Sequence, residues 1–213
     1  MTDAAATAQS PHPPLILASA SPRRLDLLAS IGLTPDAVEP THIDEHEIPG
    51  ELPGPLALRL AQEKAQAHPV VQAAGDAFVL AADTVVGVGR RVLPKTLDES
   101  EARRCLDLLS GRNHRVFTGI AASGPGGAFA ARVVETRVKF KRLSKAEIDA
   151  YIASGEWHGK AGGYGIQGRA GCFVVNLIGS YTGVMGLPLY ETANLLGGLG
   201  YPVTERMGER QEA

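Results

Sequence analysis

The sequence has few of the residues that stabilise secreted or metal-stapled folds. Only two cysteines occur in 213 residues, Cys105 and Cys172, and they show no Cys-x-x-Cys spacing. Neither a disulfide framework nor a structural zinc site is therefore expected. The N-terminal stretch lacks the basic start and apolar run of a signal peptide, and no apolar run approaches the ~18 residues of a membrane span. These absences favour a soluble protein in a reducing, cytoplasmic setting, without a membrane partner.

A dominant charge of one sign is also missing. The 21 Lys and Arg residues are balanced by 23 Asp and Glu residues, which gives a formal net charge of -2 and identifies no partner. Aromatic residues make up only 5%, and Trp157 and Tyr164 form no stacking array for a nucleic acid polymer. In contrast, 44% hydrophobic residues suffice for a buried core and exclude a disordered chain.

Three common catalytic signatures are absent: the P-loop, the Gly-x-Ser-x-Gly elbow and the His-Glu-x-x-His zinc motif. A Gly-x-Gly-x-x-Gly string occurs at residues 163–168, but an expected helix precedes it and an expected strand follows. A dinucleotide fingerprint requires the opposite order. The string therefore predicts a loop whose backbone closely approaches a ligand, with Gln167 as its versatile hydrogen-bonding side chain. A glycine-bent connection between packed elements remains the alternative.

Hydrophobic periodicity predicts alternating strands and helices in one α/β unit with a mixed β-sheet. Strands are expected at residues 15–18, 36–39, 77–88, 116–123, 128–143 and 172–178. Helices are expected from Pro22 to the turn at Gly32 and at residues 56–67, 98–109, 144–155 and 188–196. Side chains expected to cap helices are Ser21, Asp98 with Glu101, and Ser144 with Glu147. The domain is expected to span residues 14–203, between tails at 1–13 and 204–213.

A Ser-Ala-Ser-Pro-Arg-Arg string at residues 19–24 connects the first expected strand to the first expected helix. A helix N-terminus presents unpaired amide groups and a positive dipole. With two hydroxyls and two guanidiniums beside it, this turn predicts an anion site for which phosphate is the natural ligand. For the string alone, a capped helix with solvent-facing arginines is the more common interpretation.

Asp83 interrupts an apolar run between Ala82 and Thr84. A buried carboxylate requires a partner or a function. One hypothesis is a metal ligand or general base at the carboxyl end of a central strand, where α/β proteins bind ligands. The alternative is an acid at a strand end, satisfied by neighbouring amides. Asp44 and Glu45, from an earlier loop, are candidates for a second carboxylate.

Five strings, taken together and in this order, resemble the Maf family, nucleoside triphosphate pyrophosphatases once described as septum-formation inhibitors. The strings are Leu-Ala-Ser-Ala-Ser-Pro-Arg-Arg (17–24), Ala-Asp-Thr (82–84), Leu-Ser-Gly through Thr-Gly (109–119), Gly-Lys-Ala-Gly-Gly-Tyr-Gly-Ile-Gln-Gly (159–168) and Gly-Ser-Tyr through Gly-Leu-Pro (179–188). Several motifs in order are far more specific than any one of them.

The resemblance implies an elongated mixed-sheet α/β fold, related to the inosine triphosphate pyrophosphatases, with two lobes around a nucleotide cleft. It also implies hydrolysis of a nucleoside triphosphate to the monophosphate and pyrophosphate with a divalent metal, Mg or Mn, usually in a homodimer. The expected catalytic residues are the general base Asp83, Glu45 and Lys95, with Asp83 and Glu45 as metal ligands. The expected substrate-binding residues are Ser21, Arg23, Arg24, Lys64, Thr84 and Gln167. One departure concerns Lys95, because the family commonly has Lys-Pro where this chain has Pro94-Lys95-Thr96.

Within the family, the Gly-Tyr-Gly-Ile-Gln-Gly string resembles the branch that acts on dTTP and UTP. The 7-methyl-GTP branch carries Glu at the position of Gln167. Thymine and uracil offer an N–H donor and carbonyl acceptors, which a Gln amide can meet with both of its groups. The alternatives are 7-methyl-GTP specificity, a nucleotide-binding regulator of septum formation that performs no chemistry, and, with less support, a dinucleotide-dependent oxidoreductase.

Overall fold

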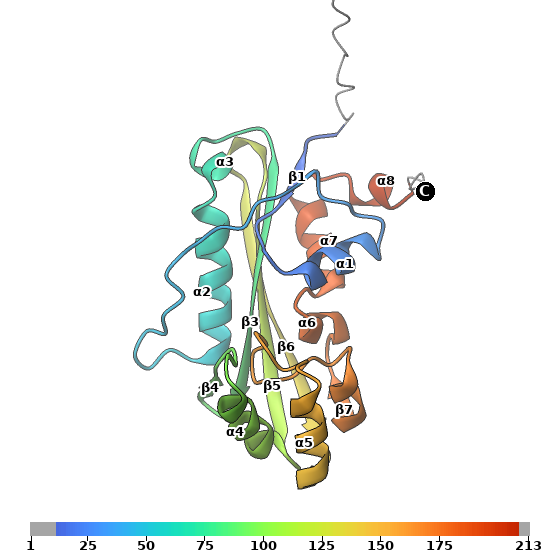
Figure 1. Cartoon of the computed structure of the whole chain (residues 1–213). Helices are drawn as coiled ribbons and strands as arrows, with labels where there is room; N and C mark the ends of the chain where they lie inside the picture. Colours follow the sequence, from blue (N-terminus) through green and yellow to red (C-terminus); the bar gives the residue numbers. More distant parts are fainter. Residues whose placement is uncertain (1–11, 209–213) are drawn as a thin grey trace, which may run out of the picture.

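A seven-stranded mixed β-sheet runs through the centre of the molecule in the computed structural model, which describes residues 12–208 (Figure 1). The strands are β1 (Leu15–Leu17), β2 (Ala37–Val38), β3 (Phe78–Val88), β4 (Arg91–Leu93), β5 (Asn113–Ser123), β6 (Phe129–Phe140) and β7 (Val174–Ile178). Their order is β2-β1-β3-β5-β6-β7, and β4 also pairs with β3. Because β1 is parallel to β2 and β3 while the other pairs are antiparallel, the expected mixed sheet is confirmed.

The helices lie on both sides of this sheet. They are α1 (Pro22–Ala29), α2 (Pro53–Gln66), α3 (Pro69–Gln72), α4 (Glu99–Leu109), α5 (Lys145–Ala153), α6 (Tyr181–Met185), α7 (Leu189–Gly198) and α8 (Val203–Gly208). In Figure 1, α2 covers one face, α1, α6 and α7 lie over the other, and α4 and α5 cover the lower end. The molecule is elongated along β3, β5 and β6, as expected. No helix of residues 12–208 is both long and apolar enough to cross a membrane.

Two of the three expected helix caps form. The Ser144 hydroxyl and the Glu147 carboxylate complete a capping box at α5, and Asp98 accepts a hydrogen bond from the Glu101 amide at α4. Ser21 stands at the N-cap position of α1, but its side chain makes no capping bond, so that prediction is wrong. The Oγ of Ser19 accepts the Ser21 amide at 3.3 Å, a contact in the turn before the helix that caps none of the helix's own amides.

The boundaries differ from expectation in several places; among them, β6 ends at Phe140 instead of residue 143, and β5 and α2 each begin three residues early. A 3-10 helix at Arg169–Phe173 delays the last strand, so β7 begins at Val174 instead of residue 172. The sequence did not predict the short helices α3 and α6. Residues 204–208 were expected to belong to a tail, but they form part of α8, whose first residue, Val203, is buried. The expected tail residues 1–11 and 209–213 lie outside the described residues.

The sheet has a gap along one edge of β3. On that edge β1 pairs with residues 78–80, and β4 pairs with residues 86–88. On the opposite edge β5 pairs with β3 continuously from Val79 to Gly87. Asp83 and Thr84 therefore lie where β3 has lost β1 as a neighbour and has not yet gained β4. Asp83 lies in the middle of a strand, not at its carboxyl end as the sequence indicated; the carboxyl end nearest to it belongs to β1.

Candidate active site

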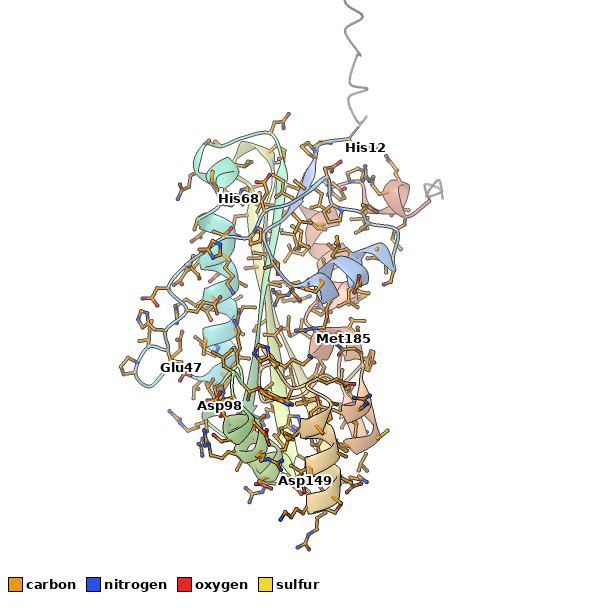
Figure 2. All side chains as sticks on the ribbon, viewed as in Figure 1. His12, Glu47, His68, Asp98, Asp149 and Met185 are labelled. Atoms are coloured by element: carbon orange, nitrogen blue, oxygen red, sulfur yellow. The ribbon has the colours of Figure 1, made fainter. Side chains whose placement is uncertain are left out.

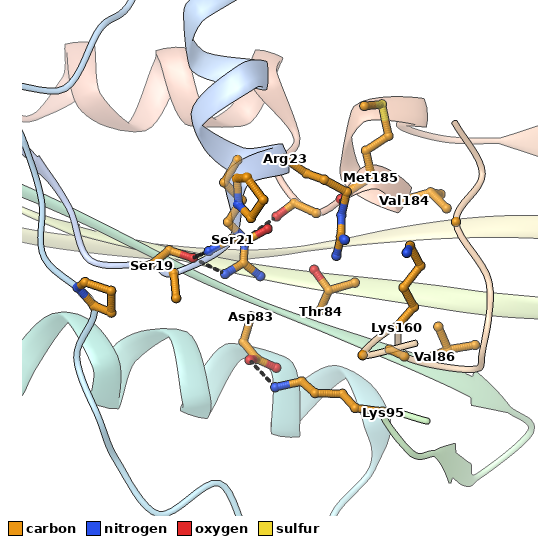
Figure 3. Close-up of a pocket in the computed structure, with 18 of the residues that line it drawn as sticks. Ser19, Ser21, Arg23, Asp83, Thr84, Val86, Lys95, Lys160, Val184 and Met185 are labelled. Atoms are coloured by element: carbon orange, nitrogen blue, oxygen red, sulfur yellow. Dashed lines mark hydrogen bonds and ion pairs between the residues drawn. The ribbon is translucent and has the colours of Figure 1, made fainter. Parts of the chain in front are cut away.

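A cleft of about 410 Å³ opens at this gap in the sheet (Figure 3). Its walls come from the β1–α1 turn, the loop between β2 and α2, the segment after β4, the glycine-rich loop and the end of α6. Five basic and two acidic side chains line it; these are Arg23, Arg24, Lys64, Lys95 and Lys160, with Glu45 and Asp83. The cleft therefore carries an excess of positive charge that the nearly neutral whole chain conceals.

Asp83 and Thr84 reach the cleft from opposite faces of the sheet, because neighbouring residues of a strand point to opposite sides. In Figure 3, Asp83 points toward α2, and Thr84 points the other way. Thr84 Oγ1 lies 3.1 Å from Thr118 Oγ1, and the Thr118 hydroxyl donates to the Gly183 carbonyl at 2.7 Å. Since the single Thr118 proton is used there, Thr84 is the donor in the Thr84–Thr118 pair, and its oxygen can accept a hydrogen bond from a ligand.

Close approach of α2 to the sheet brings Lys64 onto Asp83. Gly119 lies opposite Asp83 in β5, and a Cβ atom there would be 2.1 Å from the Ala57 carbonyl oxygen of α2. Only glycine allows the helix to lie this close. Two turns further along α2, the buried Lys64 Nζ donates to Asp83 Oδ1 at 2.6 Å, and Asp83 itself is only 2% exposed. The apolar strand thus holds a carboxylate whose charge is paired with an ammonium.

Glu45 lies between two lysines in the same cleft. Its Oε1 is 2.7 Å from Lys64 Nζ, and its Oε2 accepts a hydrogen bond from Lys95 Nζ at 2.5 Å. Partial burial opposes the charge of Glu45, but the hydrogen bonds from Lys64 and Lys95 outweigh it and lower the pKa of its carboxyl to about 2. Lys95 Nζ is also 4.0 Å from Asp83 Oδ1. Despite the shifted proline, Lys95 therefore points into the cleft.

The two arginines of α1 are held by backbone carbonyls across the cleft. Arg24 donates to the Gly186 carbonyl at 2.9 Å and to Ser19 Oγ at 2.7 Å. Arg23 donates to the Met185 carbonyl at 3.3 Å. Burial lowers the pKa of both guanidiniums, and at Arg24 the charge of Asp83 opposes that effect. These hydrogen bonds orient the two guanidiniums and leave some of their N–H groups available to bind an anion.

Lys160 is a cleft residue that the site prediction missed. It belongs to the glycine-rich loop, and partial burial, followed by the charge of Arg23, lowers the pKa of its ammonium. Neither Lys160 nor Arg23 has an acidic partner within 4.0 Å among residues 12–208, in contrast to Lys64 and Lys95. A signal was present in the sequence, since Lys160 is the one basic residue inside the quoted glycine-rich string.

The glycine-rich loop is fixed against the segment after β4. The Gly162 amide donates to the Pro94 carbonyl at 2.9 Å, and the Thr96 amide donates to the Lys160 carbonyl at 3.1 Å. Gly162 and Gly163 have positive φ angles of 66° and 71°, which side chains rarely adopt. Within the loop, the Tyr164 hydroxyl hydrogen-bonds with the buried His114 Nε2 at 2.7 Å. The loop is thus a rigid wall of the cleft, and it carries the exposed Gln167 at the rim.

All nine residues expected in the site line this one cleft: Ser21, Arg23, Arg24, Glu45, Lys64, Asp83, Thr84, Lys95 and Gln167. Asp44 does not belong to the group, because its carboxylate pairs with His46 at 2.9 Å on an exposed part of the loop. Of the two neighbouring acids, only Glu45 therefore supplies the second carboxylate.

A divalent metal matches the chemistry of the donors, although they do not form a closed cage. No group of three or more His, Cys, Asp or Glu residues suited to a metal occurs within residues 12–208. Asp83 and Glu45 offer carboxylate oxygens that converge on the same Lys64 ammonium. Mg²⁺ in phosphate-handling sites commonly uses one or two carboxylates together with substrate phosphates and water. The two acids fit that incomplete, substrate-dependent type of site.

The fold and this cleft define an α/β protein with a polyanion-binding site. A family profile described as "Maf-like protein" matches residues 14–199. A protein named "dTTP/UTP pyrophosphatase" from Maricaulis maris (strain MCS10) is 84% identical over 199 residues, which cover 93% of this chain and 94% of that protein. Another of the same name, from Caulobacter vibrioides (strain ATCC 19089 / CIP 103742 / CB 15), is 63% identical over 89% of this chain and 97% of that protein. The chain therefore belongs to the Maf-like family, as its motifs indicated.

Among solved structures, a nucleoside-triphosphatase / dITP/XTP pyrophosphatase from Mycobacterium abscessus aligns with 61% of this chain and 73% of that chain. The TM-score is 0.36 and the identity 16%, a likeness too weak to carry a conclusion.

Proposed function

We propose that this protein hydrolyses nucleoside triphosphates, preferably dTTP and UTP, to the nucleoside monophosphate and pyrophosphate. The observation that carries the proposal is the buried Asp83 carboxylate in a cleft with five basic side chains. Such a site combines a proton acceptor with groups that bind a polyanion. The names of the relatives support the reaction and the choice of nucleotide.

Asp83 acts as a general base and not as a source of free hydroxide. An Asp with pKa near 3.9 and bulk water near 15.7 differ by about 12 units, which amounts to roughly 16 kcal/mol against complete proton transfer. Asp83 therefore accepts the proton of the attacking water only as the bond to the α-phosphorus forms. For this role the Lys64–Asp83 contact has to loosen when substrate binds, and the phosphates offer Lys64 another anionic partner.

Asp83 and Glu45 would hold a divalent cation, Mg or Mn, together with phosphate oxygens. When bound, such an ion lowers the pKa of water and neutralises charge on the leaving pyrophosphate. Lys64 is paired with both acids, and Lys95 is paired with Glu45. The low pKa of Glu45, about 2, means that this ligand stays charged at neutral pH.

The remaining cations would hold the triphosphate for in-line attack. Arg24 is oriented by Ser19 and Gly186, beside Ser21 in the same turn. Arg23 and Lys160 lack acidic partners among residues 12–208, so an anion placed between them relieves their mutual repulsion. We assign these two residues to the leaving pyrophosphate. Fixed charges that are already in position stabilise the transition state without the cost of reorganisation.

Gln167 and Thr84 would select the base. A Gln amide can both donate and accept, and the Thr84 oxygen is free to accept, because its proton goes to Thr118. Thymine and uracil present an N–H flanked by carbonyls, which matches that combination of groups. We also propose that the protein forms a homodimer. We further propose a reducing, cytoplasmic setting, which is supported by the two free cysteines.

The experiment is incubation of the purified protein with Mg²⁺ or Mn²⁺ and a panel of dTTP, UTP, CTP, GTP, ATP and 7-methyl-GTP, with products separated by anion exchange. We expect monophosphate and pyrophosphate in equal amounts, fastest from dTTP and UTP. In ¹⁸O-labelled water, attack at the α-phosphorus places the label in the monophosphate. Release of diphosphate and phosphate, or label in pyrophosphate, would contradict the proposed reaction. Tight nucleotide binding without any product would instead favour a non-catalytic regulator.

A further inference from the structure

Glu45 occupies a well-defined position although its loop has little regular structure. The chain between β2 and α2, residues 39–52, contains neither helix nor strand, and most of its residues are exposed. Figure 2 shows this loop, with Glu47 labelled, on the outer side of α2. An exposed loop of this length is mobile unless specific contacts fix it. The position of the Glu45 carboxylate between Lys64 and Lys95 therefore depends on contacts that fix the rest of this loop.

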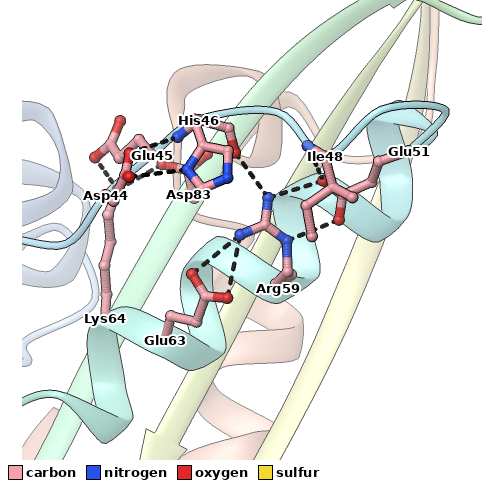
Figure 4. Close-up of polar contacts among 9 residues, drawn as sticks. All are labelled: Asp44, Glu45, His46, Ile48, Glu51, Arg59, Glu63, Lys64 and Asp83. Carbon is pink, nitrogen blue, oxygen red and sulfur yellow. Dashed lines mark hydrogen bonds and ion pairs between the residues drawn. The ribbon is translucent and has the colours of Figure 1, made fainter.

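Arg59, on the exposed side of α2, provides those contacts (Figure 4). Its Nε and NH2 donate to the two carboxylate oxygens of Glu51, each at 2.8 Å. Its NH2 also donates to the carbonyl of His46, the residue next to Glu45, at 3.0 Å. One guanidinium thus binds the loop at two places, immediately after Glu45 and just before α2 begins.

The Arg59 side chain is itself fixed from its own helix. Both distances from its NH1 to the Glu63 carboxylate oxygens are 3.1 Å, one turn further along α2. The Glu51 side chain is only 10% exposed and that of Arg59 21%. The hydrogen bonds from Arg59 lower the pKa of Glu51, so this carboxylate stays charged and paired. Paired bonds between a guanidinium and a carboxylate fix geometry as well as charge.

On these contacts we propose that Arg59 is a positioning residue, which fixes the loop of residues 39–52 so that Glu45 reaches Lys64 and Lys95. This inference rests on the proposed function, because it takes Glu45 to be part of the active site. Arg59 lies on α2 with Lys64, so one rigid helix carries both the lysine that contacts Glu45 and the clamp that holds its loop. Lysine at position 59 would keep the charge but could not bind Glu51 and His46 in the same fork.

The experiment compares Arg59→Gln and Arg59→Lys with Arg103→Gln as a matched control. Arg103 also bonds a carboxylate on its own helix, Glu99, and one on a neighbouring helix, Asp149, but it lies on α4 outside the cleft. We expect Arg59→Gln to lower kcat by about 10- to 100-fold, as loss of a supporting contact does. Arg59→Lys should recover part of this loss, the KM for dTTP should change less than kcat, and Arg103→Gln should keep the kcat of wild type.

A double-mutant cycle distinguishes positioning of Glu45 from a general effect on folding. In a Glu45→Gln background, Arg59→Gln should cause little further loss of kcat, because the group that Arg59 positions is already gone. The same loss of kcat in both backgrounds, or a wild-type kcat for Arg59→Gln, would overturn the inference.

Hydrogen exchange of the amides at residues 43–48 provides a readout that does not depend on activity. We expect faster exchange in Arg59→Gln than in wild type and in Arg103→Gln, with unchanged protection in β5. If the wild-type protein releases no pyrophosphate, the proposed function fails, and the exchange rates alone then decide whether Arg59 holds the loop. Unchanged exchange at residues 43–48 would refute the clamp even if the protein is an active pyrophosphatase.

Discussion

The buried His114 makes the stability of the glycine-rich wall dependent on pH. His114 is 2% exposed, and its Nε2 bonds the Tyr164 hydroxyl. Its Nδ1 is buried without a hydrogen-bond partner among the described residues, so a proton on that nitrogen would have no acceptor. Burial therefore lowers the pKa of His114 from an ordinary 6.5 to about 4. The folded protein holds this ring neutral across a range in which the unfolded chain protonates it.

The sign and the magnitude follow from linkage. Between pH 6.5 and 4 the unfolded chain binds more protons at this position, so stability is present above the unfolded pKa and is lost as the pH falls. A difference of about 2.5 units corresponds to a loss of about 3 kcal/mol by pH 4, of which about 2 kcal/mol is already lost at pH 5. Against a typical total stability of roughly 5–15 kcal/mol, one histidine thus contributes a substantial part of the acid sensitivity.

The assay is urea unfolding of wild type and His114→Gln at several pH values between 7.5 and 4. We expect the variant to be less stable at pH 7.5, because it loses the ring contacts with Phe140 and Tyr164. The gap in unfolding free energy should then shrink, or reverse, by about 3 kcal/mol on acidification. Other acids titrate in both proteins and cancel. A gap that stays constant with pH would refute the assignment of a neutral, buried His114.

Three further predictions concern the cleft. Asp83→Asn should retain nucleotide binding, measured by calorimetry, while turnover falls by about 10²- to 10⁴-fold, as for loss of a general base; near-normal turnover would remove Asp83 from the chemistry. Lys160→Met should raise the inhibition constant of pyrophosphate roughly tenfold or more, with Lys160→Arg close to wild type; an unchanged constant would contradict its contact with the leaving group. Gln167→Glu should lower the ratio of UTP to 7-methyl-GTP turnover, and an unaltered ratio would exclude Gln167 from base selection.

Local signals in the sequence were sufficient for much of the fold. The Ser144–Glu147 capping box and the unusual Asp83 in an apolar strand each depend on residues that are close in sequence. The cap predicted at Ser21 does not form, and the hydroxyl that is bonded in this turn is that of Ser19, which accepts the Ser21 amide and an Arg24 guanidinium N–H. The Ser19–Arg24 contact could not be predicted from the local pattern, because the Arg24 side chain is also held by the distant Gly186 carbonyl.

Contacts between distant segments were beyond the reach of sequence patterns. Lys64 meets Asp83 across 19 residues, and Lys95 meets Glu45 across 50. The first contact depends on how closely α2 lies on the sheet, and that depends on Gly119, which looks like an ordinary strand glycine in the sequence. Arg59 likewise resembles a common surface charge. Its importance becomes visible only when the loop of Glu45 is seen to pass over it.

The gap along the edge of β3 explains why Asp83 and Thr84 belong to one site although their side chains point to opposite faces of the sheet. In a fully paired sheet, Asp83 and Thr84 would face separate compartments, divided by the next strand. Because β1 ends at Leu17, opposite Leu80, and β4 first pairs with β3 at Leu93, opposite Val86, this edge of β3 stays open over a few residues, and both faces reach the same cleft. The acid then contacts Lys64 of α2, while the threonine bonds Thr118 on the other face. An Asp-Thr pair in such a gap can therefore join a reacting centre to a recognition surface, and closing the gap with a longer β1 would separate the two.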